Sequence, residues 1–364
     1  MTLILAIAIL FVFAAPAAIL SLALCGVMER YGPRDVPDGG RKTQAQATPT
    51  AGGVGFLIAA LAGVLMLAAA DASLFELPAG GAMLPMLIMV AGAVVLGLID
   101  DVADLPVIPR LAVLAGLSLF GAAFSLPDIP LHGPTGHAVM LPSVLSVAGA
   151  ALFIFVMTNA VNFMDGANGF VASALLPAFA ALALYPVLAA PDFYDALWTT
   201  PLPTALAATA LAGALVGFLA WNASGRLFMG DAGALGLGAA FAGLSCLCVA
   251  IYSSGATRVS VWFPATLALP ILVDVFMTLI WRFRQGEELM EAHRDHAYQL
   301  FLRDDWPHAM VAGLWARLAS VCAVAGLIAA LAGPLWSFWV FIALLAVGVW
   351  LWVRQRRLYF PDGA

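Results

Sequence analysis

Charged residues are scarce in this sequence of 364 residues: Asp, Glu, Lys and Arg make up only 10% of it, whereas hydrophobic residues make up 63%. A water-soluble domain has roughly 25% charged and about 45–50% apolar residues, so this composition excludes one. Long basic blocks are also missing, because the 15 Lys and Arg residues are scattered, and this argues against a nucleic-acid partner. The bilayer is therefore the main solvent of the chain, and we expect an integral membrane protein.

Only four cysteines are present, and none is placed for redox or zinc chemistry. Cys25, Cys246, Cys248 and Cys322 lie in or beside apolar runs, and the second and third are one residue short of a CxxC spacing. We interpret them as small side chains that pack in the protein or face lipid.

Strand-like alternation is absent, so the segments that cross the bilayer are expected to be helices. A helix needs about 20 apolar residues to cross. The apolar runs predict eleven spans, near 3–27, 50–70, 82–99, 109–125, 144–162, 169–190, 202–221, 232–252, 260–283, 311–332 and 335–353. The chain is thus predicted to be an all-α polytopic membrane protein with a single membrane domain over 1–364.

The cations predict on which side each loop lies, because loops rich in Lys and Arg stay in the cytoplasm. With the N-terminus outside, only Arg258 among the Lys and Arg residues falls outside. The inner segments are then 28–49, 100–108, 163–168, 222–231, 284–310 and the tail from Arg354. Thr2–Gly26 has no basic residue before it and is followed by Arg30 and Arg34, so we expect an uncleaved first span. With eleven spans and the N-terminus outside, the C-terminus is expected in the cytoplasm.

Two loops are long enough to carry structure. The outer stretch 126–143 is predicted to form a hairpin in which His132 and His137 are solvated. The inner loop 284–310 is too short for a core of its own, and we expect it to contribute to the functional site instead.

Four polar clusters fall on the predicted inner side, each at the end of a span. They read GLIDDVADLP (97–106), NAVNFMDGANGF (159–170), RLFMGDAGALG (226–236) and MEAHRDHAYQ (290–299). The outer loops carry only scattered acids, so the clusters predict one site at the inner membrane surface.

The first cluster packs Asp100, Asp101 and Asp104 at the C-terminal end of a helix. That end carries partial negative charge, so aspartates there cost stability unless a cation holds them. Asp100 and Asp104 share a face if the helix continues, and Mg²⁺ is the usual partner of such carboxylates. The alternative is that the acids only mark where the lipid ends.

The second cluster spaces its polar residues by three, which aligns them along one stripe if they lie on a helix. They are Asn159, Asn162, Asp165 and Asn168. Amides both donate and accept hydrogen bonds, and this suits sugar hydroxyls and nucleobase edges. A helix cap followed by a glycine turn is the alternative.

The third cluster places Asp231 between Gly230 and Gly233, just before an apolar helix. Asp231 is then either an ordinary N-cap or the carrier of a metal to a phosphate bound at the helix N-terminus. The Lys and Ser/Thr of a P-loop are missing, so this is not a P-loop.

The fourth cluster holds His293, Arg294, His296 and Tyr298. Arg and His together bind phosphate or pyrophosphate, whereas His293 and His296 with no nearby carboxylate pair are a weak zinc signature. The four clusters predict phosphoryl transfer, in which carboxylates hold Mg²⁺, Mg²⁺ holds a diphosphate and cations neutralise the remaining charge.

One acid, Asp274, lies inside the span 260–283 after Pro270. An acid at that depth is a functional candidate, or it pairs with Arg282, or it caps a helix broken by the proline. It leaves a second function open, a multi-span transporter using Asp274, although a carrier gathers more ionisable residues near the midplane.

At these clusters the sequence resembles the polyprenyl-phosphate N-acetylhexosamine-1-phosphate transferases. That family includes the phospho-N-acetylmuramoyl-pentapeptide translocase and the initiators of O-antigen, enterobacterial common antigen and teichoic acid. The resembling elements are DDVAD at 100–104, NAVNFMDG at 159–166, FMGDAG at 228–233 and the His/Arg loop, in the family's order.

The resemblance implies that a sugar-1-phosphate of the N-acetylhexosamine type passes from a UDP-sugar to polyprenyl (undecaprenyl) phosphate, with release of UMP. The implied cofactor is Mg²⁺, with Mn²⁺ as the alternative, and the implied place is the cytoplasmic face of a bacterial inner membrane. Direct attack or an aspartyl-phosphate, and a monomer or a homodimer, are left open.

The resemblance also assigns roles. Asp231 is the leading metal ligand, Asp100 is a second ligand or the base on the lipid phosphate, and Asp101 assists one of them. The implied substrate-binding residues are Asn159, Asn162, Asp165 and Asn168 for the nucleotide, and Arg41, Arg294, His296 and Tyr298 for the diphosphate or sugar.

The loop form HRDHAYQ is most similar to the branch that starts lipopolysaccharide O-antigen or capsule chains. The muramoyl-pentapeptide branch has a run of histidines there. Three positions depart from the family pattern: Ala234 replaces a small hydroxyl residue, Asn168 replaces an acid, and a Gln replaces a His in the first inner loop (41–53).

Overall fold

The computed structural model describes residues 2–35, 47–70, 83–126, 128–189, 203–253, 258–288 and 293–360, which are helical apart from two short hairpins and the connections. The long helices are α1 (Thr2–Tyr31), α2 (Gly52–Ala70), α3 (Met83–Ala103), α4 (Val107–Ser125), α5 (Ser143–Met164), α6 (Phe170–Ala189), α8 (Pro203–Asn222), α9 (Gly230–Tyr252), α10 (Trp262–Gln285), α12 (His308–Ala332) and α13 (Pro334–Tyr359). The shorter elements are α11 (Ala297–Arg303) and the antiparallel pairs β1 (Arg34–Asp35) with β2 (Thr48–Pro49) and β3 (Pro130–His132) with β4 (Ala138–Met140). The all-α prediction is confirmed.

Each predicted span has a counterpart among these helices. Of the helices in the described ranges, ten are long and apolar enough to cross a membrane, and α2 is a shorter apolar helix. The largest difference lies at the C-terminus, where α13 continues to Tyr359, so the arginines at 354, 356 and 357 lie on a helix rather than in a tail. The guanidinium of Arg356 lies 4.5 Å from the ring centroid of Trp352, and such stacking lets the helix carry charge beyond its apolar run.

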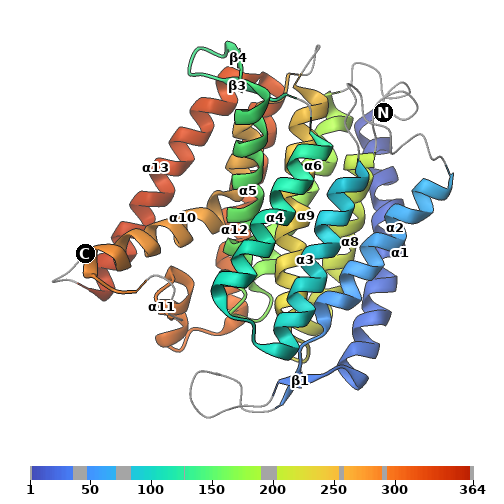
Figure 1. The fold of residues 1–364 in the computed structure, drawn as a ribbon, viewed down its shortest axis with the longest axis vertical. Helices are drawn as coiled ribbons and strands as arrows, with labels where there is room; N and C mark the ends of the chain where they lie inside the picture. Colours follow the sequence, from blue (N-terminus) through green and yellow to red (C-terminus); the bar gives the residue numbers. More distant parts are fainter. Residues whose placement is uncertain are drawn as a thin grey trace.

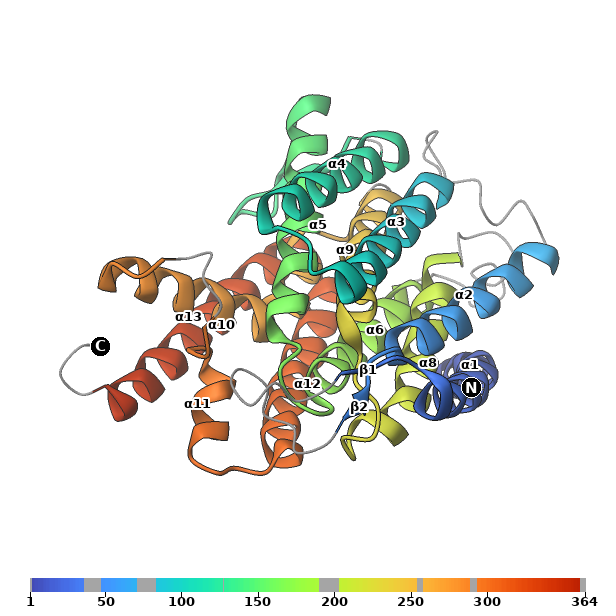
Figure 2. The ribbon, with the colours of Figure 1, turned by 60° about the horizontal axis from the view of Figure 1, so that its bottom comes forward.

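Helix α9 forms the centre of the bundle (Figure 2), and α2, α3 and α5 pack against it. In the most apolar 18-residue stretch of α9, 89% of the residues are buried inside the protein. In the corresponding stretch of α13, at the periphery, 11% are buried. The sequence of α9 is rich in Gly and Ala, and small residues let helices approach closely in lipid, where packing rather than the hydrophobic effect joins them. The third polar cluster therefore sits at the start of the most central helix.

The two ends of the bundle carry different structures. Figure 1 shows the N-terminus and the β3–β4 hairpin at one end, and β1, α11 and the α3–α4 connection at the other. The four polar clusters lie at the second end, as the predicted topology requires. That this end faces the cytoplasm stays a prediction.

Helix α10 diverges from the other helices. It packs against α12 and α13 and contains Pro270, which removes one intrahelical hydrogen bond. Its C-terminal half points away from the bundle in Figures 1 and 2, and α11 packs against α12 and α13. The described part of the fourth cluster, 293–299, thus contacts α10, α12 and α13.

The outer stretch forms the predicted hairpin, in which His132 is paired with Ala138. One part of the prediction is wrong: His137 is exposed, but only 2% of the surface of His132 is exposed. The indole N–H of Trp262 donates a hydrogen bond to the His132 carbonyl oxygen at 2.6 Å. This contact fixes the strand against the start of α10, and the imidazole is buried with it.

Burial and the positive charge of Arg258 hold the pKa of His132 below its ordinary value of 6.5. The fold therefore favours the neutral imidazole, whereas the unfolded chain takes up a proton as the pH falls below about 6.5. Stability should be lost as the pH is lowered from about 7.5 to about 5, and His132→Gln should lose less. Thermal unfolding in detergent measures this. His137→Gln is the matched control and should keep the wild-type pH dependence, and an equal dependence in both variants would contradict the prediction.

Candidate active site

Asp100 is the buried acid at the end of α3. Its carboxylate forms an ion pair with Arg110 in the first turn of α4 and accepts a hydrogen bond from the Leu105 N–H at 2.9 Å. Only 3% of the Asp100 side chain is exposed. The sequence predicts that a cation offsets the charge of these acids. For Asp100, this cation is Arg110 of the next helix. The sequence analysis does not single out Arg110 as a partner of Asp100. The one feature that could have indicated it is its place, in the first turn of the span that follows an acidic helix end.

The third acid of the first cluster stands apart. Helix α3 ends at Ala103, and Asp104 is exposed with φ 47°, in the left-handed region. The prediction that Asp100 and Asp104 share a helical face is therefore wrong, because the helix does not continue.

Asp101 caps helix α9. Its two carboxylate oxygens accept hydrogen bonds from the N–H groups of Asp231 (2.9 Å) and Ala232 (3.2 Å). The N-terminus of a helix carries partial positive charge, so α9 supplies the cationic partner of Asp101. Asp231 lies in the first turn and not at the N-cap, so the N-cap alternative is wrong. Asp101 also occupies two of the amides that were candidates for phosphate.

The turn that carries Asp231 is held by the start of α2. The Gly53 N–H donates to the Met229 carbonyl oxygen at 2.8 Å, and the Phe228 N–H donates to the Pro49 carbonyl oxygen at 2.8 Å. The segment PTAGG at 49–53, at the end of the first inner loop, therefore fixes the backbone around Asp231.

Gly97 allows α3 and α9 to approach closely enough for the acids to meet. A Cβ atom there would lie 2.4 Å from the Ala232 nitrogen, a backbone atom that cannot rotate aside. Gly97→Ala should lower stability by about 1–3 kcal/mol, the usual cost of overpacking, as measured by thermal unfolding in detergent. Gly116→Ala in α4, where no atom lies within 4 Å, is the matched control and should not lose stability. Equal losses in the two variants would contradict the prediction.

The second cluster spans the end of α5 and the turn before α6. Asn159 and Asn162 lie on α5, and Asp165 is its C-cap. Asn168 lies beyond the helix, so the predicted single stripe does not extend to it. The buried Asn159 amide donates to the Phe155 carbonyl oxygen of its own helix at 2.8 Å. The other three members are half-buried and are the more accessible to a ligand.

Asp165 lies within electrostatic reach of the first cluster. Burial and the negative charge of Asp101 raise the pKa of Asp165 to about 7. The acids of the two clusters are therefore near enough to repel one another, although they belong to different helices.

Two residues that sequence reasoning misses hold the Asn168 turn. Asn222, at the end of α8, accepts a hydrogen bond from the Gly169 N–H at 2.8 Å and donates one to the Leu227 carbonyl oxygen at 2.9 Å. His308 Nδ1 accepts a hydrogen bond from the Asn168 N–H at 3.1 Å. Neither residue belongs to a motif, and each is recognisable only as a polar residue at a helix end.

Tyr298 of α11 connects the fourth cluster to the second. It is fully buried and stacks on Phe170, with ring centroids 4.4 Å apart. A Cβ atom at Gly166 would lie 2.2 Å from its hydroxyl oxygen, so the glycine of the second motif makes room for this phenol. Burial, together with the negative charges of Asp274 and Asp165, raises the pKa of Tyr298, and the phenol stays protonated.

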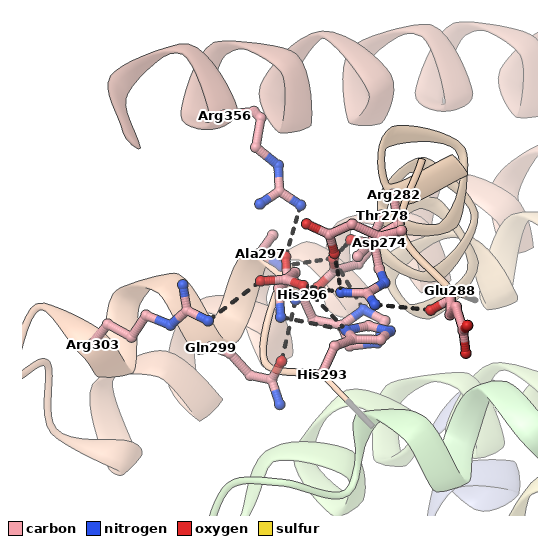
Figure 3. Close-up of polar contacts among 12 residues, drawn as sticks. Asp274, Thr278, Arg282, Glu288, His293, His296, Ala297, Gln299, Arg303 and Arg356 are labelled. Atoms are coloured by element: carbon pink, nitrogen blue, oxygen red, sulfur yellow. Dashed lines mark hydrogen bonds and ion pairs between the residues drawn. The ribbon is translucent and has the colours of Figure 1, made fainter. Parts of the chain in front are cut away.

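Asp274 supports the same loop from α10 (Figure 3). Its Oδ1 accepts hydrogen bonds from the Ala297 N–H at 2.7 Å and the Thr278 hydroxyl at 3.1 Å, and Oδ2 accepts one from the Tyr298 N–H at 3.4 Å. His296 Nδ1 lies 3.6 Å from Oδ1, and both side chains are 3% exposed. Of the alternatives for Asp274, a capping role fits, although the capped helix is α11 rather than α10.

Arg282 is not the partner of Asp274. Its Nη1 lies 2.5 Å from Asp295 and 2.6 Å from Glu287. Burial, together with the electrostatic influence of His296 and Arg282, lowers the pKa of His293 to about 4, so His293 is neutral at pH 7. The predicted ligand Arg294 is half-buried beside it, and Arg41 lies outside the described residues.

The predicted clusters thus come together. Hydrogen bonds from α9 to Asp101 join the first and third, charge joins Asp101 to Asp165 of the second, and Tyr298 joins the second to the fourth. The arrangement gathers carboxylates, amides, imidazoles and guanidinium groups at one end of the bundle.

The carboxylates fit a magnesium ion that shares its ligands with a substrate. Within the described ranges, no three His, Cys, Asp or Glu side chains gather closely enough to hold a metal by themselves. The carboxyl groups of Asp231 and Asp100 are hydrogen-bonded to one another, so both lie within reach of one cation. Mg²⁺ commonly takes one or two carboxylates and completes its shell with water and substrate phosphates. Asp231 is the less committed of the pair, because Arg110 and Leu105 already bind Asp100.

Comparison with known proteins identifies the family of the chain. A model of glycosyl transferase family 4 matches residues 83–249, which run from α3 into α9. The phospho-N-acetylmuramoyl-pentapeptide-transferase of Streptomyces avermitilis is 30% identical over 246 residues, 59% of this chain and 68% of that protein. The protein of that name from Streptomyces coelicolor is 27% identical over 331 residues (82% and 89%), and the one from Kineococcus radiotolerans is 34% identical over 241 residues (56% and 65%).

The fold and these similarities define a polytopic membrane phosphotransferase. The chain belongs to glycosyl transferase family 4, the family of the polyprenyl-phosphate N-acetylhexosamine-1-phosphate transferases that its four clusters resemble.

Proposed function

We propose that the protein transfers a sugar-1-phosphate of the N-acetylhexosamine type from a UDP-sugar to polyprenyl phosphate, as the first membrane step of a cell-envelope polysaccharide. An oxygen of the lipid phosphate forms a bond to the sugar-linked phosphorus, and the bond from that phosphorus to UMP breaks. The single observation that carries the proposal is the contact of Asp101 with the start of α9, which brings Asp100, Asp101 and Asp231 together.

In this proposal the two sides of the site have different tasks. Asp231 and Asp100 hold Mg²⁺, which when bound supplies positive charge to the diphosphate. Asp100 is then a metal ligand or the base for the lipid phosphate, and Asp101 keeps α3 and α9 in register. The half-buried Asn162, Asp165 and Asn168 bind the nucleotide.

The half-buried Arg294 would hold the diphosphate, with the buried His296 and Tyr298 forming the wall between that loop and the nucleotide-binding turn. A guanidinium group suits phosphate oxygens because charge-assisted hydrogen bonds are the strong ones. We place the site at the cytoplasmic face of a bacterial inner membrane, since the cation-rich ends of the helices lie there by the positive-inside rule.

The donor sugar distinguishes two branches of the family. We propose the branch that starts O-antigen or capsule chains, supported by the loop HRDHAYQ at 293–299. The relatives named above are phospho-N-acetylmuramoyl-pentapeptide-transferases, so that donor is the competing substrate.

The test is a panel of donors given to the purified protein with polyprenyl phosphate and Mg²⁺, in which UMP release and the mass of the lipid product are measured. The panel contains UDP-N-acetylhexosamines, their deoxy derivatives and UDP-N-acetylmuramoyl-pentapeptide. UMP release that requires both the lipid and Mg²⁺ supports the proposal. A product formed only from the pentapeptide donor would reassign the branch, and release from no donor would refute the enzyme.

A further inference from the structure

The last turns of α13 are fastened to the loop that carries His296. Nη2 of Arg356 donates a hydrogen bond to the Asp295 carbonyl oxygen at 2.7 Å, and Nε2 of Gln355 donates one to the Ala297 carbonyl oxygen at 2.8 Å. The two acceptors flank His296 on either side. Two adjacent residues of one helix therefore fix the backbone before and after this histidine.

Arg356 is held in place on all sides although it meets no carboxylate in these contacts. It is only 1% exposed, and its guanidinium carbon lies 4.3 Å from the ring centroid of Trp281, 4.5 Å from that of Trp352 and 5.4 Å from that of Phe360. Burying a guanidinium costs free energy unless polar and π contacts compensate it. Its Nη1 is buried without a hydrogen-bond partner among the described residues, which adds to the free-energy cost of burying this arginine.

The side chain of Asp295 is held separately. Its carboxylate accepts hydrogen bonds from Arg282 of α10 at 2.5 Å and from Arg303 of α11 at 3.3 Å. Figure 3 shows the loop with Arg356 reaching it from one side and Arg282 and Asp274 from the other. The carbonyl groups on either side of His296 are thus bound by α13, whereas the Ala297 and Tyr298 N–H groups are bound by Asp274 of α10. The acidic side chain of the loop is bound by α10 and α11.

We propose that Arg356 and Gln355 are positioning residues that hold the loop 293–298 in the conformation that receives the nucleotide-sugar. The proposal rests on the function proposed above. It follows from geometry. Asp274 of α10 lies against His296 and accepts hydrogen bonds from the Ala297 and Tyr298 N–H groups. The two donors of α13 bind the carbonyl groups of Asp295 and Ala297, on either side of His296. Helix α13 is peripheral, because only 11% of the residues in its most apolar stretch are buried. Loss of this contact should therefore leave the central helices folded.

The test compares Arg356→Gln with Arg357→Gln, a neighbouring arginine that is exposed. Two readouts are taken from the full-length protein in detergent: hydrogen exchange of the amides in 293–303, and separate KM values for UDP-sugar and polyprenyl phosphate. Arg356→Gln should speed exchange in this segment and raise KM for UDP-sugar about tenfold, the effect of losing one charge-assisted hydrogen bond, with KM for the lipid unchanged. Arg356→Lys, which keeps a cation and a donor, should recover part of both effects.

Distinct outcomes separate this inference from the proposed function. Unchanged exchange and KM in Arg356→Gln would overturn it, and so would faster exchange spread equally over α3 and α9, because that marks a general loss of stability. A wild-type protein that releases no UMP, combined with faster exchange confined to 293–303 in Arg356→Gln, would refute the transferase while keeping the loop attachment. Arg357→Gln should behave as wild type throughout.

Discussion

Asp231→Asn is expected to lower kcat for UMP release by roughly a thousandfold or more, the scale seen when a preorganised electrostatic group is removed. Asn has nearly the same size as Asp but carries no negative charge. Asp231 is the carboxylate of the pair that is not already bound to an arginine, so its charge is the one most available to a cation. The release of UMP at saturating donor and lipid measures the effect, and a titration with Mg²⁺ should show a higher half-saturating concentration in the variant.

The same variant should remain folded. The hydrogen bond from the Asp231 backbone N–H to Asp101 does not depend on the side chain, and the new amide still has a donor for Asp100. Stability should therefore change by no more than about 1 kcal/mol in thermal unfolding. Asp305→Asn is the matched control for the loss of one charge. Asp305 is exposed, lies at the same end of the bundle and has φ 58°, a conformation that Asn also tolerates. A kcat within tenfold of wild type would show that Asp231 is not a metal ligand.

The membrane helices could be predicted from the sequence because their length is set by the bilayer and not by contacts. Apolar runs of about 20 residues found every long helix, and only the ends moved. The gathering of the four clusters at one end also followed from the sequence, because the scattered cations assign loops to sides. No tertiary contact had to be known for either prediction.

The partners within the site could not be predicted in this way. The cap formed by Asp101 joins residues 130 positions apart in the chain, and no local pattern marks that pair. Charge balance required a cation near the acids, but an arginine and a helix N-terminus satisfy that requirement as well as a metal does. The acids at the helix end therefore required positive charge nearby, while the sequence left the identity of each partner open.

Burial was the other quantity that the sequence did not reveal. His132 lies in a hairpin rich in Pro and Gly and was expected in water, yet it packs against the start of α10. Tyr298 and His296 were expected to face a ligand, and both are almost wholly buried. A polar residue in a loop is exposed only if no distant helix covers it, and that depends on tertiary packing.

Asp274→Ala is expected to release the start of α11. The Ala297 and Tyr298 N–H groups lose their acceptor, the Thr278 hydroxyl loses its own, and His296 loses its charged neighbour. Removing one partner from a buried network of this kind should lower stability by about 3 kcal/mol, as measured by thermal unfolding in detergent. UMP release should fall about a hundredfold, because displacing a substrate-binding loop by about an ångström has that effect.

Graded variants at the same place separate this role from transport. Asp274→Asn keeps one acceptor oxygen for Ala297, and Thr278→Val removes a single hydrogen bond to Asp274, a loss of about 1 kcal/mol. The loss of sugar-phosphate transfer should therefore be largest in Asp274→Ala, smaller in Asp274→Asn and smallest in Thr278→Val. A carrier that used Asp274 to couple ions would respond to charge alone, so Asn and Ala would be equally inactive and wild-type proteoliposomes would accumulate substrate without releasing UMP. Both Asp274 oxygens already accept hydrogen bonds from the N-terminus of α11, so this carboxylate could bind an ion only by breaking those hydrogen bonds. We therefore expect the losses of activity to be graded rather than equal.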